Sequence, residues 1–381
     1  MSLLFYDDSP VFGGHEVMAL LGLEAVLAAV PGPVHFLAPA ANHKLCAEVT
    51  ALAASYPQLR LEPLAYHASK LEALRNPLRP SRSRRLAKRL LELEPALVVA
   101  IQGNIEHSSL VLHAARRAAI PVTSYIPVPH SNAVMGARLG ALRDVFASRL
   151  FQLPDSFITI SDEMARLLRC RGATAPIHIV YNGIDTSRFQ PGDPVAACRR
   201  LGLPPDKILL GVIGRCEFRQ KQQHLLVQAL AATSALATAC HLVFAGGGPD
   251  GAALQTLIAR HRLAATVLPW CDPALLYQAL DALVIPSRYE GLPLVMLEAL
   301  ASGTAVLASD RDGMKDLLPG AWRFEPDNPT ALASTLTQFI QQGRPAPAAA
   351  LVARVRDSMS LEAFGRAFAA TLRTLMTSPL I

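Results

Sequence analysis

Short apolar runs alternate along the chain with longer stretches in which apolar residues recur every three or four positions. The short runs are typical of buried strands and the longer stretches of helices. In the first half the runs are Leu3–Tyr6, Val34–Ala38, Ala96–Ile101, Val122–Ile126, Phe157–Ile160 and Ile177–Val180. After about Pro191 the pattern restarts, with Ile208–Ile213, His241–Ala245, Ala282–Pro286, Ala305–Ala308 and Trp322–Phe324. Two successive strand–helix series predict two doubly wound α/β domains.

The length and a Pro/Gly-rich segment support this division. A chain of 381 residues suits two domains. The segment Phe189-Gln190-Pro191-Gly192-Asp193-Pro194 is typical of a linker between them. We therefore expect an N-terminal domain over residues 1–190, a C-terminal domain over 191–358 and a separate C-terminal helical segment over 359–381.

Composition excludes several classes of protein. With 51% hydrophobic and 17% charged residues, the chain can bury real cores and is not disordered. The longest apolar stretch, Val17–Val30, is interrupted by Glu24, so no membrane-spanning helix is expected. The start, Met1–Pro10, has no basic cluster of the kind found in signal peptides. The six cysteines form no Cys-x-x-Cys pair and suggest buried thiols in a reducing cytoplasm.

Most of the net charge of +6 comes from one segment, Arg75–Arg89. Its leucines at positions 86, 90 and 91 recur at roughly helical spacing, which predicts a basic amphipathic helix. Either this is a solvated helix face, or it docks on an anionic lipid surface or an anionic acceptor. No aromatic-interleaved patch or nucleic-acid motif is present, so a nucleic-acid partner is not expected. The basic residues of the segment are Arg75, Arg79, Arg82, Arg84, Arg85, Lys88 and Arg89.

Gly13-Gly14-His15-Glu16 follows the first predicted strand and opens a helix. Two glycines let the backbone approach a ligand closely, and the helix N-terminus offers unpaired N–H groups that suit phosphate. Many strand–helix turns contain such a pair, so the motif alone is weak. The dinucleotide pattern Gly-x-Gly-x-x-Gly is absent, which argues against an NAD enzyme.

Arg215 and Lys221 follow the first strand of the second domain. Because ligands of open parallel sheets bind beyond the carboxyl ends of the strands, both cations are placed to reach one anionic group. Arg219 is a competing candidate in the same loop. With two such domains, we expect the active site in the cleft between them.

The strongest motif runs from a predicted strand end through Glu290 to Glu298. Eight helical residues span about 12 Å, which is too far for the carboxylate pair of a retaining glycosidase. The two carboxylates could instead hold the sugar hydroxyls and the ribose of one extended ligand. Glu298 lies in an otherwise apolar helix, where a carboxylate needs a partner. The backbone between them can meet charge on the ligand, through Gly291, Leu292, Pro293 and Leu294.

Taken in order, these segments resemble the retaining nucleotide-sugar glycosyltransferases of family 4, which have the GT-B fold of two Rossmann-like domains facing a central cleft. The resemblance covers most of the chain and is clearest from Phe157 onward. It rests on Ile158–Ser161, Val180–Asp185, Phe189–Pro191, Gly214-Arg215 with Lys221, Ala245–Pro249 and the Glu290-x7-Glu298 block. It also implies that the last helix, roughly Leu361–Met376, packs back on the N-terminal domain.

The resemblance implies a role for each matching residue. Arg215 and Lys221 match the pair that binds the donor diphosphate, Glu290 the glutamate facing the donor sugar, and Glu298 the one holding the ribose. Gly13 and Gly14 match a glycine loop near the phosphates. His130 is our candidate for the catalytic histidine near the reacting sugar, and His107 is its rival.

Other positions are less fixed by the family pattern. Trp270 and Cys271 fall where relatives frame the nucleobase, although the usual glycine-containing turn is absent here. The family's glycine after the lysine is Gln222. Acceptor choice belongs to the N-terminal domain, where His15, Glu16 and His107 are candidates. Asp310-Arg311-Asp312 looks like the metal motif of another glycosyltransferase fold, but its place favours a turn.

We therefore expect a retaining glycosyltransferase that needs no metal or other cofactor. It would move a hexose from a nucleotide-diphosphate sugar, UDP-linked by preference and GDP-linked otherwise, to a glycan or lipid-linked hydroxyl. The expected setting is bacterial lipopolysaccharide or polysaccharide assembly, in the cytoplasm or peripherally on the inner membrane face. The resemblance implies a front-face route in which the leaving phosphate helps deprotonate the acceptor. Alternatives are a sugar-phosphate synthase, a phosphorylase, or a non-catalytic glycan-binding subunit of the same fold.

Overall fold

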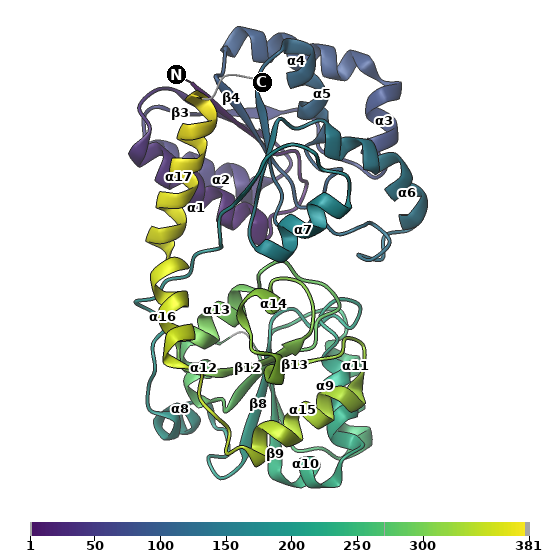
Figure 1. Cartoon of the computed structure of the whole chain (residues 1–381), viewed down its shortest axis with the longest axis vertical. Helices are drawn as coiled ribbons and strands as arrows, with labels where there is room; N and C mark the ends of the chain where they lie inside the picture. The colour runs from purple at the N-terminus through teal and green to yellow at the C-terminus, as the bar shows by residue number, and fades with distance from the viewer. Residues whose placement is uncertain (1, 270, 378–381) are drawn as a thin grey trace. The chain divides into compact units, whose positions relative to one another are not determined.

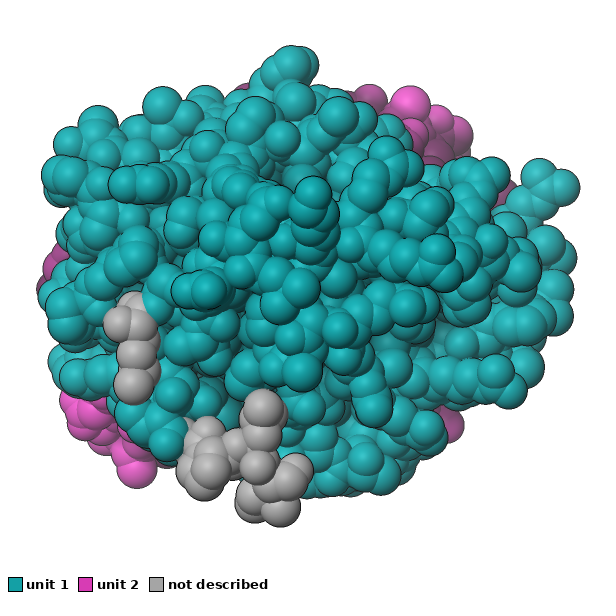
Figure 2. Space-filling model, turned by 90° about the horizontal axis from the view of Figure 1, so that it is seen from above, with its two compact units in different colours: residues 1–183, 361–381 teal, residues 184–360 magenta. Residues whose placement is uncertain are grey.

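A computed structural model describes residues 2–269 and 271–377. The chain forms two compact units, coloured separately in Figure 2. Unit 1 comprises residues 1–183 and 361–381, and unit 2 comprises residues 184–360. The boundary between the units therefore lies after residue 183, a few residues earlier than the boundary at residue 190 that the sequence predicts. The entry and the exit of unit 2 lie together, because Ile184 forms a parallel bridge with Ser360 and donates its N–H to Met359 O at 2.9 Å.

Unit 1 is built on a seven-stranded sheet in the order β3-β2-β1-β4-β5-β6-β7. Every described strand pair in it is parallel. Buried apolar side chains fill the central strands, as the continuous apolar runs predicted. The strands are β1 (Leu3–Tyr6), β2 (Val34–Pro39), β3 (Leu59–Leu64), β4 (Leu97–Ile101), β5 (Val122–Tyr125), β6 (Ser156–Thr159) and β7 (Ile177–Ile179).

Helices cover both faces of this sheet (Figure 1). They are α1 (Gly14–Ala29), α2 (His43–Ser55), α3 (Glu72–Leu78), α4 (Pro80–Leu93), α5 (Ser109–Ala118), α6 (Gly140–Ala147), α7 (Asp162–Cys170) and α17 (Leu361–Thr377), with a short 3-10 turn at Ser148–Gln152.

Unit 2 repeats the plan with a six-stranded parallel sheet in the order β10-β9-β8-β11-β12-β13. Its strands are β8 (Ile208–Ile213), β9 (Cys240–Ala245), β10 (Ala265–Leu268), β11 (Ala282–Ile285), β12 (Ala305–Ser309) and β13 (Arg323–Phe324). Its helices are α8 (Pro194–Leu201), α9 (Gln223–Ala231), α10 (Ser234–Ala239), α11 (Gly251–His261), α12 (Pro273–Ala279), α13 (Leu294–Ala301), α14 (Met314–Leu317), α15 (Pro329–Gln341) and α16 (Ala349–Ser358), with a 3-10 turn at Gly320–Trp322.

Three helices of unit 2 begin with the same local signal, an Asp or Asn followed by Pro. The side chains of Asp193, Asp272 and Asn328 each accept an N–H from the first turn of α8, α12 and α15, respectively. The following proline has no N–H to leave unsatisfied, and its ring fixes a helical φ. These starts are therefore encoded locally.

Two edge strands, β3 and β10, were missing from our sequence prediction. Their side chains are mostly half-exposed, and the residues 59–64 and 265–268 form no continuous apolar run. An edge strand has one neighbour only, so the pressure for an apolar sequence is weaker there. The prediction was wrong because it searched for strands buried on both faces.

The basic segment Arg75–Arg89 forms two helices rather than one. α3 ends at Leu78, and α4 starts at Pro80 after Arg79, whose φ is −123°. Arg82 pairs with Glu72 and Arg89 with Glu62, so part of the positive charge is neutralised within unit 1. The exposed basic residues are Arg79, Arg84, Arg85 and Lys88. Across the described residues, no helix is both long and apolar enough to cross a membrane.

Both sheets reverse their strand order once, and each reversal opens a crevice for a ligand. In unit 1 the reversal lies between β1 and β4, and in unit 2 between β8 and β11. The loops that leave the carboxyl ends of two such strands turn to opposite faces, which leaves space between them. The motifs after β1, β8 and β11 are thus placed at the binding edges of the two sheets.

The C-terminal helix α17 packs along α1 of unit 1 (Figure 1). The contact is close because Gly22 lies against the ring of Phe368, where an added Cβ would come within 2.8 Å. Gly365 lies equally close to Ala25 on the other side of the contact. The Phe368 ring also meets Tyr125 edge-on at 5.5 Å and is fully buried. The end of the chain is therefore part of the core of unit 1.

Replacing Phe368 with Ala should destabilise unit 1. Loss of a fully buried phenylalanine costs about 3–5 kcal/mol, because the transferred surface is lost and a cavity remains. Thermal melting and limited proteolysis of the purified protein should show a lower melting temperature and faster cleavage. Phe146→Ala is the matched control, since that ring is 40% exposed. Equal melting temperatures for the two variants would contradict the packing described.

Candidate functional site

The loops after β8 and β9 in unit 2 touch each other through bare backbone. Gly214 and Gly246 have φ values of +132° and +122°, which other residues rarely adopt. A Cβ on Gly248 would lie 2.2 Å from Cys216 O, so only glycine fits there. The Cys216 N–H donates to Gly247 O at 2.9 Å and holds the two loops together. The sequence thus builds a closely packed edge with little side-chain cover.

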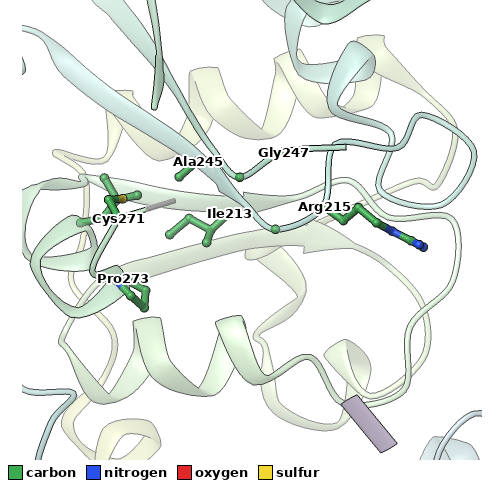
Figure 3. Close-up of a pocket in the computed structure, with 9 residues that line it drawn as sticks. Ile213, Arg215, Ala245, Gly247, Cys271 and Pro273 are labelled. Carbon is green, nitrogen blue, oxygen red and sulfur yellow. The ribbon is translucent and has the colours of Figure 1, made fainter. Parts of the chain in front are cut away.

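This edge forms one wall of a cavity of about 300 Å³. Figure 3 shows Ile213, Ala245 and Cys271 around it, with the Arg215 side chain extending away from them. Cys271, one of the two residues expected to frame a nucleobase, therefore lines the cavity, whereas Trp270 lies outside the described residues. The lining is completed by Gly214, Arg215, Gly246, Gly247, Pro273 and Leu276.

Lys221 and Glu290 meet across the reversal of the unit 2 sheet. Lys221 Nζ lies 2.6 Å from Glu290 Oε1, and the Glu290 residue is only 8% exposed. The loops that carry them are also joined by backbone, since the Arg288 N–H donates to Gln220 O at 2.7 Å. A lysine from the loop after β8 and a glutamate from the loop after β11 are therefore held as one charged pair.

Arg215 lies in the same loop as Lys221 but has a different acidic partner. Its guanidinium contacts the Glu217 carboxylate, and its side chain remains 62% exposed. In the described structure an acid lies beside each of the two cations, and their joint binding of one anionic ligand stays a prediction. The competing candidate, Arg219, lies two residues before Lys221 in the same loop.

Glu298 has the partner that its apolar helix required. The hydroxyl of Tyr277, on α12, donates to Glu298 Oε2 at 2.7 Å. Burial raises the pKa of Glu298 above its usual value, while the Tyr277 bond and the charge of Arg188 act in the opposite direction. Tyr277 follows Leu276, which lines the cavity, so α12 joins the cavity wall to this carboxylate.

The loop Glu290–Pro293 is held from the neighbouring strand β12. Asp312 Oδ2 accepts the Glu290 N–H at 2.7 Å, and the Gly313 N–H donates to Gly291 O at 2.9 Å. A Cβ on Gly313 would lie 2.6 Å from that oxygen, so the approach needs glycine. In the segment that the sequence predicts to meet ligand charge, Leu292 is buried. Pro293 directly precedes α13, and Leu294 is the first residue of that helix.

Asp312 and Tyr277 are site residues that the sequence analysis missed. Both act through contacts with residues more than twenty positions away, which no local motif predicts. We had interpreted Asp310-Arg311-Asp312 as a turn, and it does turn after β12, with Asp310 pairing with Arg323. The sequence did indicate that Glu298 needs a partner in its apolar helix, but it did not identify that partner as Tyr277.

Gln222 occupies the position where the family resemblance implies a glycine. Its φ is +51°, in the left-handed region that glycine adopts most readily. The side-chain amide donates to Asp327 Oδ1 at 2.6 Å, and the residue is buried. The loop thus keeps the glycine conformation and gains a side-chain tether.

In unit 1, the glycine turn after β1 is held by Glu16. Gly13 caps α1, and its N–H donates to Glu16 Oε2 at 2.7 Å, while Gly14 is the first helical residue. Burial alone would raise the pKa of Glu16, but its contact with His15 and the N–H groups of the turn lower it below its usual value. Glu16 is fully buried, so this proposed acceptor residue holds the turn itself.

His15, Glu16 and His107 lie near one another, together with a residue we did not predict, Asp7. His15 Nε2 is 2.8 Å from Glu16 Oε1, and His15 packs on Gly103, where a Cβ would lie 2.6 Å from the ring. Burial, with a smaller contribution from His15, lowers the pKa of His107 to about 4, so that ring is neutral at pH 7.

Asp7 is buried, and its Oδ2 has no hydrogen-bond partner among the described residues. Burial, and next the charge of Glu16, raise its pKa well above the usual value. Asp7, His15 and Glu16 each offer one possible metal-ligand atom. These three atoms lie within 4.8 Å of one another, a spacing that a metal ion could bridge. The cluster lies where the strand order of unit 1 reverses, between the loops after β1 and β4.

The remaining catalytic candidate, His130, lies in the long connection between β5 and α6 of unit 1. It is half-buried, between Pro129 and Ser131. This loop starts at the carboxyl end of the strand next to β4, and it therefore belongs to the same edge of the sheet as His107. The two rival histidines thus come from neighbouring loops.

Comparisons with known proteins agree with this architecture. The family model "Glycosyltransferase Family 4" matches residues 14–188, and "Glycosyl transferases group 1" matches residues 207–342. The lipopolysaccharide core biosynthesis mannosyltransferase LpsB of Rhizobium meliloti (strain 1021) is 31% identical over 250 residues, covering 60% of this chain and 68% of that protein.

A D-inositol 3-phosphate glycosyltransferase of Actinosynnema mirum is 35% identical over 171 residues, or 39% of this chain and 41% of that enzyme. Among solved structures, Anabaena Alr3699/HepE in complex with UDP has a TM-score of 0.76 at 18% identity, over 98% of this chain and all of that one. Sucrose-phosphate synthase from Thermosynechococcus elongatus has a TM-score of 0.77 at 19% identity, with both chains covered in full.

Two Rossmann-like units with charged loops at their strand-order reversals define a glycosyltransferase of the GT-B fold. The matched models and LpsB narrow the class further: the chain belongs to glycosyltransferase family 4. Both the family and the fold expected from the sequence are thereby confirmed.

Asp312→Ala should lower donor turnover more than it lowers nucleotide binding, because it removes the acceptor that positions Glu290. A tenfold loss in turnover corresponds to about 1.4 kcal/mol, within reach of one lost charged hydrogen bond. Asp312→Asn keeps an oxygen acceptor and should restore part of the rate. Asp310→Ala is the control on the same loop. Equal losses in the Ala and Asn variants would refute this positioning role.

Asp8, next to Asp7, gives a pH test of the unit 1 site. It accepts the Ser108 N–H at 2.7 Å, and burial raises its pKa to about 7. Folding thus favours the protonated form, and this stabilisation is lost as the pH rises from the unfolded value of about 3.9 through about 7. The free energy of unfolding of the wild type, relative to Asp8→Asn, should fall between pH 4 and 8. Asp206→Asn, at an exposed position, should show no such trend.

Proposed function

We propose that this chain is a retaining glycosyltransferase that takes a hexose from a nucleotide-diphosphate sugar, with UDP as the favoured nucleotide. The observation that carries the proposal is the Lys221–Glu290 pair, 2.6 Å apart at the strand-order reversal of unit 2. The pair joins a group that can hold a phosphate to a group that can hold a sugar hydroxyl. The same loop after β8 also lines the cavity.

The donor fits unit 2 in three parts. The cavity, about 300 Å³ and lined mainly by small and apolar groups, would hold the base. Glu298, oriented by Tyr277, would accept hydrogen bonds from the ribose. Arg215 and Lys221 would bind the diphosphate, and Glu290 would then be released from Lys221 to face the hexose. The UDP preference is supported by HepE, whose structure was solved with UDP.

In the proposed reaction, the C1–O bond of the donor breaks and the nucleotide diphosphate leaves with the bonding electrons. Arg215 and Lys221 stabilise the charge that develops on it. The acceptor hydroxyl attacks the same face of the sugar and gives its proton to a phosphate oxygen, so the anomeric configuration is retained. These two cations supply the positive charge at the leaving group, and we therefore propose that no metal is required there.

We propose that the acceptor side belongs to unit 1. His15 remains 20% exposed at the glycine turn, and a neutral His107 can accept a hydrogen bond from a hydroxyl. His130 is proposed to approach the reacting sugar. The mannosyltransferase LpsB acts in lipopolysaccharide core biosynthesis, which supports a lipid-linked glycan acceptor at the inner face of a membrane. There, Arg79, Arg84, Arg85 and Lys88 could contribute about 1 kcal/mol each on an anionic surface.

A sugar-phosphate synthase is the second candidate. Two comparisons favour it, namely the D-inositol 3-phosphate glycosyltransferase and the full-length structural match to sucrose-phosphate synthase. The donor chemistry would be the same, and only the acceptor would carry a phosphate. Incubation with phosphorylated sugars and polyols, next to lipid-linked glycans, separates the two candidates by which mixture releases nucleotide faster.

Lys221→Ala and Glu290→Gln should each lower donor turnover by about two orders of magnitude or more, because transition-state charge or sugar positioning is lost. Lys221→Ala should also weaken UDP binding, whereas Glu290→Gln should not. Nucleotide release from UDP-, GDP- and ADP-sugars, with and without EDTA, gives turnover, and calorimetry gives binding. Lys207→Ala is the control, since Lys207 donates to the Thr238 carbonyl on the same unit.

Wild-type activity in either site variant would refute the assignment of the pair. Loss of activity with EDTA, recovered by adding a divalent ion, would refute metal independence and would direct attention to Asp7, His15 and Glu16. If no nucleotide sugar binds but free glycans do, the glycan-binding alternative replaces the transferase.

A further inference from the structure

Helix α6 of unit 1 exposes apolar side chains where a surface helix usually exposes polar ones. Leu139, directly before it, is 62% exposed. Within the helix, Leu142 is 53%, Val145 is 68% and Phe146 is 40% exposed. These positions are three, four and seven residues apart, so they lie on one side of a helix. Contiguous exposed apolar surface of this kind marks an interaction site more often than scattered single residues do.

The charged residues of α6 face the protein instead. Arg143 pairs with the nearly buried Glu106. Asp144 Oδ1 accepts the Asn132 N–H at 2.8 Å and contacts Arg171 at 3.0 Å. A rotation that turned the apolar side inward would break these ion pairs and leave Glu106 buried without its partner, which is costly. The outward orientation of the apolar side is therefore fixed by contacts.

Basic residues flank the apolar ones. Arg138 and Arg149 are exposed at the two ends, and the single acid among residues 138–149 is Asp144, which faces inward. Helix α3 packs against α6, as Figure 1 shows at one edge of unit 1, and ends at Leu78, which is 72% exposed and precedes the exposed Arg79. The end of α3 therefore also exposes an apolar side chain next to a basic one.

We propose that the α6 face, consisting of Leu139, Leu142, Val145 and Phe146 with Arg138 and Arg149, inserts into the headgroup region of an anionic lipid bilayer. Apolar side chains would enter the boundary of the acyl chains while the arginines meet the lipid phosphates. A second copy fits less well, because a symmetric contact would bring arginine against arginine with no acid to offset them. The proposal deepens the proposed function, since it gives a lipid-linked acceptor a fixed place beside unit 1.

The α6 face complements the basic surface of α4. Electrostatic attraction alone gives weak, reversible and salt-sensitive binding, and stable anchoring generally takes two signals. The exposed residues of α4 supply charge, and those of α6 supply apolar insertion. We therefore expect part of the binding to an anionic bilayer to persist at high salt.

Flotation with phosphatidylcholine vesicles, with and without about 30% phosphatidylglycerol, tests the α6 face. Wild-type protein should float with the anionic vesicles, in part even at high salt. The triple variant L142S/V145S/F146S should bind at least about tenfold more weakly, because its apolar contact is lost. The double variant R138E/R149E should also bind more weakly. V195S/V267S is the matched control, since Val195 and Val267 are exposed on unit 2 and should not affect flotation.

Wild-type levels of flotation in the triple variant, or no flotation of the wild type, would overturn the proposal. So would a wild-type dimer, measured by light scattering, that the triple variant converts to monomer without lipid. Thermal melting establishes that the variant is folded. Nucleotide release from a soluble donor should be the same in the wild type and the triple variant. A failure of the proposed transferase function would instead appear as absent nucleotide release in both proteins, whatever their flotation.

Discussion

The ion pair between Lys221 and Glu290 depends on one topological constraint, the reversal of strand order in a parallel sheet. Where the order reverses, the loops after β8 and β11 leave toward opposite faces, and no helix fills the space between them. Charged side chains from the two loops can therefore meet at the edge of the sheet without entering the core. The cavity wall, the Glu298–Tyr277 bond and the Asp312 contact are all arranged around these same strand ends.

The two units place charge at this edge in different ways. In unit 2 each central acid has a cation or a hydroxyl beside it, as in Lys221–Glu290 and Tyr277–Glu298. In unit 1 the carboxylates of Asp7 and Asp8 are buried, with the Tyr6 hydroxyl 3.3 Å from Asp8 Oδ2, and burial raises both pKa values. An edge with mobile cations suits a charged diphosphate, because phosphate oxygens can replace the acid. Glu16 at the edge of unit 1 differs from Asp7 and Asp8, because His15 and the N–H groups of the turn lower its pKa.

The sequence predicted the parts of this structure that depend on local pattern. Continuous apolar runs located the inner strands, and the need of Glu298 for a partner in its apolar helix was met by Tyr277. Strands β3 and β10 escaped because edge positions do not need continuous apolar residues. Asp312 and Tyr277 escaped for another reason: their partners are more than twenty residues away, and only the packed fold brings them together. Asp7 is near His15 and Glu16 in sequence, but it belongs to no motif that the prediction considered. The split of the basic segment at Arg79 had a local signal, Pro80, because a proline disfavours the helical conformation of the residue before it.

Backbone conformation shows how several loops at these edges are held. Among the described residues, six residues other than glycine have left-handed φ in loops that follow strands. Leu71, Leu139 and Asp327 are three of them, and the other three are Ser108 at +54°, Gln222 at +51° and Asp312 at +53°. Such a conformation costs of order 1 kcal/mol and persists only where surrounding contacts impose it. Each of the latter three is tied by a hydrogen bond: the Ser108 N–H to Asp8, the Gln222 amide to Asp327, and the Asp312 carboxylate from the Glu290 N–H. These three hydrogen bonds hold their loops in one conformation, as a site that must position a ligand requires.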